Sequence, residues 1–435
     1  MAQNHVIVVG GGVAGIAAAW ELARSGCRTT LVEARPVLGG RARSFRDPIQ
    51  PGRLFDSCQH VAMGCCTSLL ELFRQAGLSR LFTPSPVIHF ITPGGGRSRF
   101  EAAPLPPPAH LAWAFMGLHH LGWADKAGIA WAMASLALNG TGGAATFGEW
   151  LAAKHQTSNA IRYFWDLVIV SALNQPAATA CPRLARKVFL DGFLASRDAH
   201  ELRLPAVSLE DLFHREMGGA LRRAGARVLT DAPCREVIVE GGRAAGVACR
   251  NGERIPADGV VLAIPWDRLA GVLPGHWRGP EASGLERAGI GAVHFWFDRR
   301  VLPTPHAALV GGTAQWLFRH PQAEPEDGYL QAVVSGVDDL RLENASLADA
   351  VKADIGRFCP ASRGAGLIRI RVVREHFATF RVPAGIDRHR PAPGWIAPGL
   401  AVAGDWTGTG WPATMEGACR SGLEAARALM ARQGG

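Results

Sequence analysis

The chain contains very few lysines and tyrosines. Only four of its 46 basic residues are lysines, and only Tyr163 and Tyr329 are tyrosines, whereas 13 residues are tryptophan. The formal net charge is +9, but the sequence has no long run of consecutive basic residues and no basic helix face. We therefore predict no nucleic-acid partner, and the charge fits either a solvated surface or contact with an anionic membrane.

Long apolar runs and paired-cysteine motifs are also absent from the sequence. No stretch reaches about 18 uninterrupted apolar residues, so we predict no transmembrane helix. The N-terminus has neither a basic segment nor a cleavage site and is typical of a strand rather than a signal peptide. The nine cysteines are odd in number and form no CxxC pair, which favours free, mostly buried thiols in a cytoplasmic protein and predicts no metal site.

The remaining composition is that of a large globular protein. The 435 residues allow two or more domains, and the 48% of hydrophobic residues can form a large core. The 52 glycines have no fixed period and 19% of the residues are charged, which excludes a collagen-like or largely disordered chain.

The first 33 residues contain a complete dinucleotide-binding pattern. A β-branched run at 5–9 predicts a buried parallel strand, and a GxGxxG turn follows at 10–15. An apolar stretch at 13–25 predicts a helix, and residues 29–33 predict a second strand that ends in an acidic residue. A strand, a glycine turn, a helix and an acid in this order indicate a βαβ unit that binds a dinucleotide.

Each part of this pattern has a physical reason. Gly10 permits the tight turn, Gly12 lets a pyrophosphate approach the backbone, and Gly15 lets the helix and the strand pack closely. Free N–H groups at the start of the helix bind phosphate. Glu33 accepts hydrogen bonds from a ribose diol.

A second glycine pair follows the acidic residue. Gly39 and Gly40 precede Arg41 and Arg43, which add close backbone contact and positive charge beside the pyrophosphate. The pattern resembles the GG-R-x-S extension of the superfamily of FAD-dependent amine oxidases and carotenoid desaturases. This resemblance implies that the cofactor is FAD rather than NAD.

The C-terminal end carries two further motifs of this superfamily. Residues 399–403 predict a strand that leads into Gly404 and Asp405, and residues 412–418 lead into an apolar helix that extends to Leu429. The resemblance implies that Asp405 binds the ribityl or phosphate region, and that the start of the last helix meets the pyrimidine end of the flavin. The alternative is that Asp405 is a helix N-cap.

A third stretch, residues 205–265, completes the FAD-binding domain that the resemblance implies. It predicts a helix at 209–224, a strand pair around 241–242 and a strand at 259–265. In the superfamily, backbone groups of such a stretch contact the adenine, and here they fall near Cys234.

The predicted fold class is α/β, with a Rossmann-like FAD-binding domain of the amine oxidase type and an inserted α+β substrate domain. Residues 1–80, 205–265 and 371–435 form the discontinuous FAD-binding domain, and residues 81–204 and 266–370 form the substrate domain. The predicted FAD contacts are Gly10, Gly12, Ala14, Gly15, Glu33, Ala34, Arg35, Gly39, Gly40, Arg41, Ala42, Cys234, Gly404, Asp405, Thr414 and Met415.

The segment from 102 to 147 is almost free of charge. Asp125 and Lys126 are its only charged side chains, and the segment contains Trp113, Trp123 and Trp131. The pattern predicts two apolar helices, one on either side of Asp125, which either dip into a membrane surface or form a buried hairpin of the core. The first interpretation predicts a cytoplasmic protein that is bound peripherally to the inner face of the bacterial cytoplasmic membrane.

Shorter motifs narrow the resemblance. The chain resembles the hydroxysqualene dehydroxylases, also known as squalene-associated FAD-dependent desaturases, in FDSCQH at 55–60, FGEWL at 147–151, FWD and ALNQP within 164–176, ATF at 378–380, and the C-terminal GDWT and PATMEGA. The resemblance implies removal of the hydroxyl group of hydroxysqualene by reduced FAD, which yields squalene for squalene and hopanoid synthesis. This chain has Cys58 where the family pattern has glycine, and the larger side chain alters the backbone or the pocket wall there.

The implied reaction needs an acid, because hydroxide is a poor leaving group. His60 is the first candidate, with a structural histidine as the alternative, and Asp56 either orients His60 or caps a turn. Glu416 is a further candidate near the predicted flavin edge, unless its side chain only bonds backbone groups. Asp166 and Asn174 are weaker choices.

Three other functions stay open at this point. A carotenoid desaturase of the phytoene type takes a hydride from a long polyene with oxidised FAD and needs the same apolar tunnel. Amine oxidases often have a tyrosine at the position of Thr414 for an aromatic cage. A lipid-carrying protein without FAD does not need Glu33, Arg41 or Asp405. The motifs imply a long isoprenoid as the partner and name no electron donor for the FAD.

Overall fold

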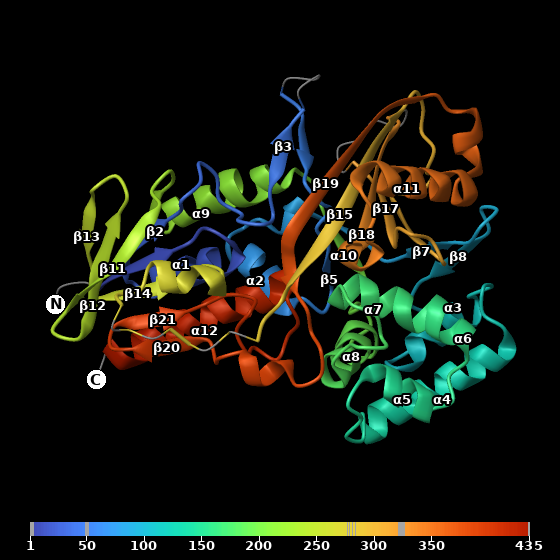
Figure 1. Ribbon diagram of the computed structural model, residues 1–435, viewed down its shortest axis with the longest axis horizontal. Coiled ribbons are helices and arrows are strands. Elements are labelled where there is room, and N and C mark those ends of the chain that lie inside the picture. Colours follow the sequence, from blue (N-terminus) through green and yellow to red (C-terminus); the bar gives the residue numbers. More distant parts are fainter. Residues whose placement is uncertain are drawn as a thin grey trace.

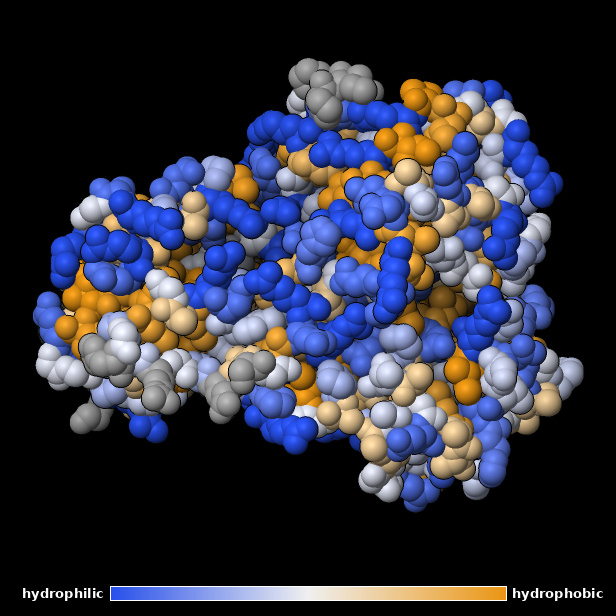
Figure 2. All heavy atoms as spheres, in the orientation of Figure 1, coloured by the Kyte–Doolittle hydropathy of each residue, from blue (hydrophilic) through white to orange (hydrophobic). Residues whose placement is uncertain are grey.

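The structure is a computed structural model that describes residues 4–47, 52–275, 277, 279–280, 282, 284–320 and 327–433. A mostly parallel sheet of six strands lies on the left of Figure 1, and a mostly antiparallel sheet of seven strands lies on the upper right. Helices form a third part below the second sheet. In Figure 2, apolar side chains reach the surface in a hollow between this second sheet and the helices.

The six-stranded sheet contains the strands that the terminal motifs predict. In spatial order its strands are β10 (Arg227–Leu229), β2 (Arg28–Val32), β1 (His5–Val9), β14 (Gly259–Leu262), β21 (Leu400–Val402) and β20 (Gly394–Ala397). All neighbours in this order are parallel except β21 and β20. The predicted strands at 5–9, 29–33, 259–265 and 399–403 are therefore confirmed, with shifted ends.

The order of the strands brings the two ends of the chain together. β14 pairs with β1 on one side and with β21 on the other. Because these strands are parallel, the residues that follow them, such as Gly10, Ala263 and Gly404, meet at the same edge of the sheet. Glu33 follows β2 at this edge as well.

Helices from distant parts of the chain share one apolar core beside this sheet. They are α1 (Val13–Arg24), α2 (Thr67–Gln75), α9 (Gly218–Arg223) and α12 (Met415–Gln433). A Cβ on Gly422 would lie 2.0 Å from the Ala14 carbonyl oxygen, so α12 and α1 approach closely at that point. The helix predicted at 209–224 is present as the π-type helix η5 (Glu210–Met217) followed by α9.

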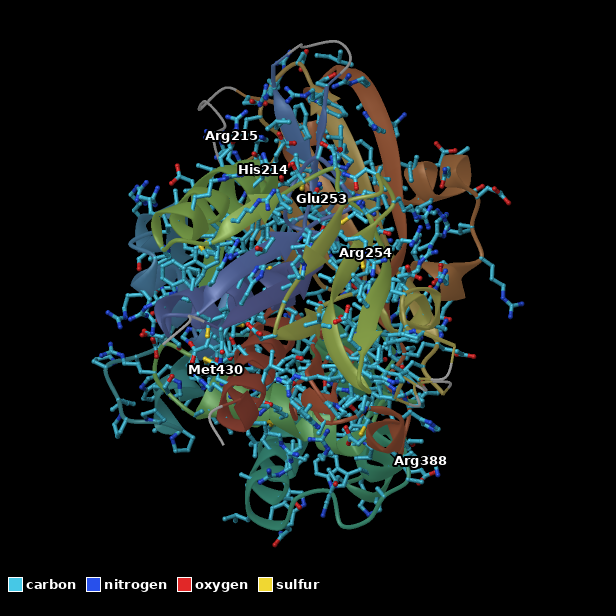
Figure 3. All side chains as sticks on the ribbon, turned by 90° about the vertical axis from the view of Figure 1, so that its left-hand side faces the viewer. His214, Arg215, Glu253, Arg254, Arg388 and Met430 are labelled. Carbon is cyan, nitrogen blue, oxygen red and sulfur yellow. The ribbon has the colours of Figure 1, made fainter. Side chains whose placement is uncertain are left out.

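Figure 3 views this end of the molecule, with Met430 on α12 and His214 and Arg215 on η5. Arg254 lies on a small antiparallel sheet, which confirms the strand pair predicted around 241–242. The strands of this sheet are β11 (Cys234–Glu240), β12 (Arg243–Cys249) and β13 (Arg254–Pro256).

The seven-stranded sheet belongs to the middle of the chain. In spatial order its strands are β19 (Leu367–Phe380), β15 (Arg287–Phe297), β18 (Tyr329–Ser335), β17 (Trp316–Arg319), β16 (His306–Leu309), β7 (Ile88–Ile91) and β8 (Arg97–Phe100). The predicted boundary between 370 and 371 falls inside β19, which pairs along its length with β15. We therefore propose that the substrate domain extends to Phe380.

The described residues also form two smaller sheets. The hairpin of β3 (Ser44–Arg46) and β4 (Leu54–Asp56) is one of them. The other contains β5 (Ala62–Met63), β9 (Leu202–Pro205) and β6 (Phe82–Ser85). Two helices, α10 (Val337–Leu340) and α11 (Asn344–Phe358), accompany the seven-stranded sheet.

The helical part contains mostly short helices. Its α-helices are α3 (Ala112–Met116), α4 (Trp123–Asn139), α5 (Phe147–Ala153), α6 (Ser158–Ala160), α7 (Asp166–Leu173) and α8 (Pro182–Phe189), with π-type helices η3 (Ile161–Trp165) and η4 (Leu190–Leu194) among them. No helix within the described ranges has both the length and the apolar character needed to cross a membrane.

The two apolar helices predicted in this segment are confirmed as α3 and α4, but Asp125 belongs to the second helix rather than to the connection between them. Asp125 lies in the first turn of α4, where its carboxylate accepts hydrogen bonds from Gly122 N at 3.2 Å and from Thr157 Oγ1 at 2.5 Å. An acidic side chain in this position starts a helix rather than interrupting one, because it satisfies N–H groups that have no partner within the helix.

The nine cysteines are all free thiols. Four of them are buried, at positions 181, 249, 359 and 419, and the other five are half-buried. The prediction of free thiols is confirmed, whereas the prediction that most of them are buried is wrong, because several lie on the wall of a cavity.

Candidate functional site

One large cavity lies where the six-stranded sheet meets the helical part. Its volume is about 1310 Å³, which exceeds the roughly 300–1,000 Å³ of an ordinary small-molecule pocket. Its wall includes residues at the carboxyl ends of β1, β2, β14 and β21, and side chains of α3, α4, α7 and α8. The cavity therefore has room for a dinucleotide and a second, apolar ligand.

The turn between β1 and α1 presents bare backbone to this cavity. Gly10 has a φ of +105°, and a Cβ on Gly15 would lie 1.8 Å from the Gly10 carbonyl oxygen, so the turn requires both glycines. A Cβ on Gly12 would have no atom nearer than the Cα of Gly40, at 4.0 Å. A Cβ on Gly40 would lie 3.1 Å from the Gly12 Cα, so the two glycines pack against each other and leave bare backbone on the cavity wall, which fits the close approach of the pyrophosphate of FAD.

Glu33 lies at the end of β2 and is nearly buried. Its Oε2 accepts a hydrogen bond from Gly11 N at 2.5 Å, and its Oε1 accepts one from Arg35 N at 2.8 Å. Each carboxylate oxygen has a second lone pair, so this position still fits the predicted bonds to a ribose diol. Ala34 and Cys234 line the cavity as well.

The C-terminal motifs reach the same cavity. Asp405 forms an ion pair with Arg41, whose Nη2 lies 2.5 Å from Asp405 Oδ1. α12 begins ten residues after Asp405, and Thr414 Oγ1 accepts a hydrogen bond from Gly417 N at 3.1 Å. The N-cap alternative for Asp405 is therefore wrong, because Thr414 holds that position.

Almost all of the predicted FAD contacts come together on this wall. The exception is Gly15, which serves the packing of α1 against the turn. The contacts that line the cavity are Gly10, Gly12, Ala14, Glu33, Ala34, Arg35, Gly39, Gly40, Arg41, Ala42, Cys234, Gly404, Asp405, Thr414 and Met415.

His60 lines the cavity in an orientation that the backbone holds. Its Nδ1 lies 2.9 Å from the Cys58 carbonyl oxygen. Since a carbonyl only accepts, Nδ1 carries a hydrogen and Nε2 is the atom that gains or loses the proton. Burial lowers the pKa of His60 and the Cys58 carbonyl raises it, while Arg41 lowers it further and Glu375 raises it. Burial is the largest of these causes, and the pKa of His60 lies below its ordinary value.

Asp56 turns to the start of a helix rather than to His60. Its Oδ1 accepts hydrogen bonds from Ser44 Oγ at 2.7 Å and from Leu209 N at 2.8 Å. Ser44 Oγ accepts one from Glu210 N at 3.0 Å, so the two side chains cap the first N–H groups of η5. Burial raises the pKa of Asp56 to about 6. The prediction that Asp56 orients His60 is therefore wrong, and the alternative of a cap is correct.

Glu416 is fully buried, and backbone groups occupy its oxygens. Oε1 accepts hydrogen bonds from Ser68 N at 3.0 Å and Arg420 Nε at 2.6 Å, and Oε2 accepts one from Leu69 N at 2.8 Å. Glu416 therefore caps the first turn of α2 and joins it to α12. Glu416 also lines the cavity, and its role as a catalytic acid stays a prediction, although its oxygens already accept hydrogen bonds from three donors.

The two weaker candidates also have structural roles. Asp166 Oδ1 accepts a hydrogen bond from Ala177 N at 2.8 Å. Asn174 Nδ2 donates to the Gly289 carbonyl oxygen at 3.0 Å, and its Oδ1 accepts from Gly336 N at 2.6 Å. Both side chains thus hold the backbone of neighbouring segments.

Polar side chains that the motifs did not single out also line the cavity. Glu375 Oε2, on β19, lies 2.7 Å from Arg43 Nη2. Lys187 pairs with Asp191 at 2.5 Å, and its Nζ lies 4.5 Å from the centroid of the Trp411 ring. No local signal marks Glu375, because 332 residues separate it from Arg43. The i,i+4 spacing of Lys187 and Asp191 is also typical of solvated helix faces and gave no indication of a cavity.

The outer face of α3 and α4 is apolar and adjoins the cavity. The exposed fractions of Trp113, Trp123 and Trp131 are 72%, 75% and 68%, and that of Leu138 is 84%. Alanines of α4 are exposed and also line the cavity, namely Ala130, Ala134 and Ala137. The alternative of a hairpin buried in the core is therefore wrong for these tryptophans.

A dinucleotide cradle that opens into an apolar chamber defines an oxidoreductase that carries FAD. The chain matches the family model described as flavin containing amine oxidoreductase over residues 13–430, and it belongs to this family. It is therefore an FAD-dependent oxidoreductase, and the predicted α/β fold class and FAD cofactor are confirmed.

Individual relatives resemble the chain over nearly its whole length. The hydroxysqualene dehydroxylase of Sinorhizobium fredii is 28% identical, over 97% of this chain and 97% of the relative, which confirms the predicted resemblance. The 15-cis-phytoene desaturase of Synechococcus elongatus is 23% identical, over 99% of this chain and 96% of the relative. The solved structure of an oxidoreductase from Methanosarcina mazei has a TM-score of 0.72 at 15% identity, over 98% of this chain and all of that chain, and shows the shared fold.

Proposed function

We propose that this enzyme removes the hydroxyl group of hydroxysqualene and yields squalene, a step of squalene and hopanoid biosynthesis. The observation that carries the proposal is the single cavity of about 1310 Å³ that joins the FAD cradle to a long apolar region. The similarity to the hydroxysqualene dehydroxylase of Sinorhizobium fredii supports the same substrate.

The apolar region of the cavity suits a long isoprenoid. Aliphatic and aromatic side chains line it, among them Phe90, Phe115, Ile129, Met133, Phe164 and Phe189. Burial contributes about 0.8 kcal/mol for each methylene group, so a long hydrocarbon binds through its length rather than through polar contacts. The same wall excludes water from the reacting carbon.

The proposed reaction breaks one C–O bond and forms one C–H bond, consumes a hydride and a proton, and releases water. When bound and reduced, FAD supplies the hydride. His60 is the residue that we propose as the proton donor, through its Nε2, because hydroxide is a poor leaving group. Its fixed Nδ1 bond to the Cys58 carbonyl keeps Nε2 free for this transfer.

We propose that different residues hold different parts of FAD. The backbone at Gly12 and Gly40 receives the pyrophosphate, and Glu33 binds the ribose diol. The N-terminal turn of α12, from Thr414, faces the pyrimidine end of the flavin, where the helix dipole stabilises negative charge. The ion pair of Arg41 and Asp405 closes the cradle from the other side.

We further propose that the enzyme is cytoplasmic and binds the inner face of the bacterial cytoplasmic membrane through the face of α3 and α4. Exposed tryptophans are typical of the membrane interface. The cavity reaches the surface between exposed alanines of this face, so an isoprenoid can pass from the bilayer into the cavity without crossing water.

Sedimentation with vesicles that contain phosphatidylglycerol tests the membrane contact. The double variant W123A/W131A is expected to bind at least about tenfold more weakly, because two large exposed rings are lost. I368A is the matched control, since Ile368 is 70% exposed on β19. Equal binding of the double variant and the control would contradict the contact.

Anaerobic incubation of the dithionite-reduced holoenzyme with hydroxysqualene tests the reaction. We expect squalene as the product, and a strong loss of turnover in H60Q with FAD still bound. The second candidate function is a desaturase of the phytoene type, which the similarity to the enzyme of Synechococcus elongatus favours. Desaturation of phytoene by the oxidised holoenzyme, without squalene from hydroxysqualene, would replace the proposal by this alternative.

A further inference from the structure

A carboxylate outside all of the sequence motifs shares the cavity wall with His60. Glu375 lies on β19, the strand at the edge of the seven-stranded sheet. Glu375, Phe377, Ala378 and Thr379 all line the cavity, and the pairing of β19 with β15 is irregular between Thr379 and Glu375. This irregular end of β19, rather than strict alternation along a strand, contributes Glu375 to the wall of the chamber that we assign to FAD and substrate.

Arg43 connects this carboxylate to the segment that carries His60. Its Nη2 lies 2.7 Å from Glu375 Oε2. Its own carbonyl oxygen accepts hydrogen bonds from Ser57 N at 2.9 Å and from Ser57 Oγ at 3.0 Å. One arginine thus holds the position of Glu375 and, through Ser57, that of the short segment that leads to Cys58 and His60.

We propose that Glu375 is the positioning residue of His60: its carboxylate, held by Arg43, stabilises the protonated imidazole at the cavity wall. The electrostatic pairing itself rests on the geometry of this wall. Its use in supplying a proton rests on the function proposed above.

The charges around His60 agree with this assignment. Burial is the largest influence on the pKa of His60 and lowers it; among the nearby charges, Arg41 from the glycine-rich loop lowers it further, whereas Glu375 from β19 raises it. The neighbouring thiol of Cys58 contributes no charge at neutral pH, because burial raises its pKa to about 12. Asp56 uses its carboxyl group at the start of η5, although it is only four residues from His60.

Histidine NMR of the FAD-loaded enzyme tests the pairing without any substrate. The protein is labelled at histidine carbon Cε1, and the signal of His60 is identified among the 15 histidines by its loss in H60Q. In E375Q we expect the pKa of His60 to fall by less than about one unit, the lower end of the effect of an opposite charge within about 4–6 Å, because Arg43 offsets part of the charge of Glu375. D56N removes the other nearby carboxyl group and is expected to leave this pKa unchanged.

Two further variants distinguish an effect of the charge of Glu375 from an effect of a disturbed structure. E375D retains the charge and is expected to restore the pKa of His60 at least in part. R43M removes the cation that neutralises Glu375 and is expected to raise this pKa, opposite in sign to E375Q. The proposal is overturned if the pKa of His60 is the same in E375Q and wild type, or if D56N shifts it and E375Q does not.

The pH profile of turnover is measured on the same proteins. We expect its alkaline limb to move in E375Q by the same amount as the pKa of His60. A shifted pKa with no turnover of hydroxysqualene in wild type would leave the pairing standing and refute the proposed reaction. Turnover with an unshifted limb would refute the positioning role and leave the reaction standing.

Discussion

The buried carboxyl group of Asp56 makes the stability of this protein depend on pH in a defined direction. Burial raises its pKa from 3.8 to about 6, although the N–H of Leu209 and the hydroxyl of Ser44 oppose this rise. A shift of about two units corresponds to about 3 kcal/mol. Between pH 3.8 and about pH 6, Asp56 still holds a proton in the folded protein that it has lost in the unfolded chain. The contribution to the free energy of unfolding is therefore fully present below pH 3.8 and is lost as the pH rises through about 6.

D56N separates this effect from the role of Asp56 as a cap. The side-chain oxygen of asparagine can still accept hydrogen bonds from Ser44 Oγ and Leu209 N, but it does not titrate. We therefore expect the difference in free energy of unfolding, D56N minus wild type, to increase by about 2.4 kcal/mol between pH 4 and pH 7, because part of the total of about 3 kcal/mol is already lost at pH 4. Urea unfolding of both proteins at several pH values measures this difference, in which the other titrating groups cancel.

E71Q is a control with the opposite sign. Glu71 is exposed, and hydrogen bonds from Arg74 and Gln75 lower its pKa to about 2. Its favourable contribution is present above its unfolded pKa and is lost as the pH falls, so the corresponding difference for E71Q decreases as the pH rises. A difference for D56N that is constant with pH, or that also decreases, would refute the reasoning about burial.

Three other substitutions test the site. G15A places a methyl group 1.8 Å from the Gly10 carbonyl oxygen, so we expect the free energy of unfolding to fall by about 3 kcal/mol or more and the bound flavin to be lost. Urea unfolding and visible absorbance measure the two effects, and a stable yellow protein would contradict the close packing. R41M removes the ion pair with Asp405 and is expected to weaken FAD binding about tenfold, which corresponds to about 1.4 kcal/mol. Calorimetric titration measures this affinity, and an unchanged affinity would exclude a role of Arg41 in closing the cradle. E416Q weakens the cap of α2 and is expected to lower the free energy of unfolding by about 1–3 kcal/mol, with unchanged turnover per bound flavin. Unchanged stability with a strong loss of turnover would instead support Glu416 as a catalytic acid.

The FAD-binding part of the fold could be predicted because its signals are local. A β-branched run forms β1, glycines form the turn at Gly10 and Gly15, and an acid ends β2. Parallel strands place their carboxyl ends at one edge, so the two terminal motifs could be expected to meet. The position of Asp125 was harder to predict, because its carboxylate bonds both Gly122 N in the first turn of α4 and Thr157 Oγ1 from a later segment.

The class of cofactor and the apolar character of the chamber could be predicted, since both depend on residue types at short spacing. Which carboxyl groups remain for chemistry depends on contacts that form only in the folded protein. Asp56 and Glu416 are used at helix starts, because buried N–H groups must find acceptors, whereas the pairing of β19 with β15 carries Glu375 to the cavity wall that His60 also lines. These bonds join residues that lie hundreds of positions apart in several cases, and a pattern of short spacing carries no information about them.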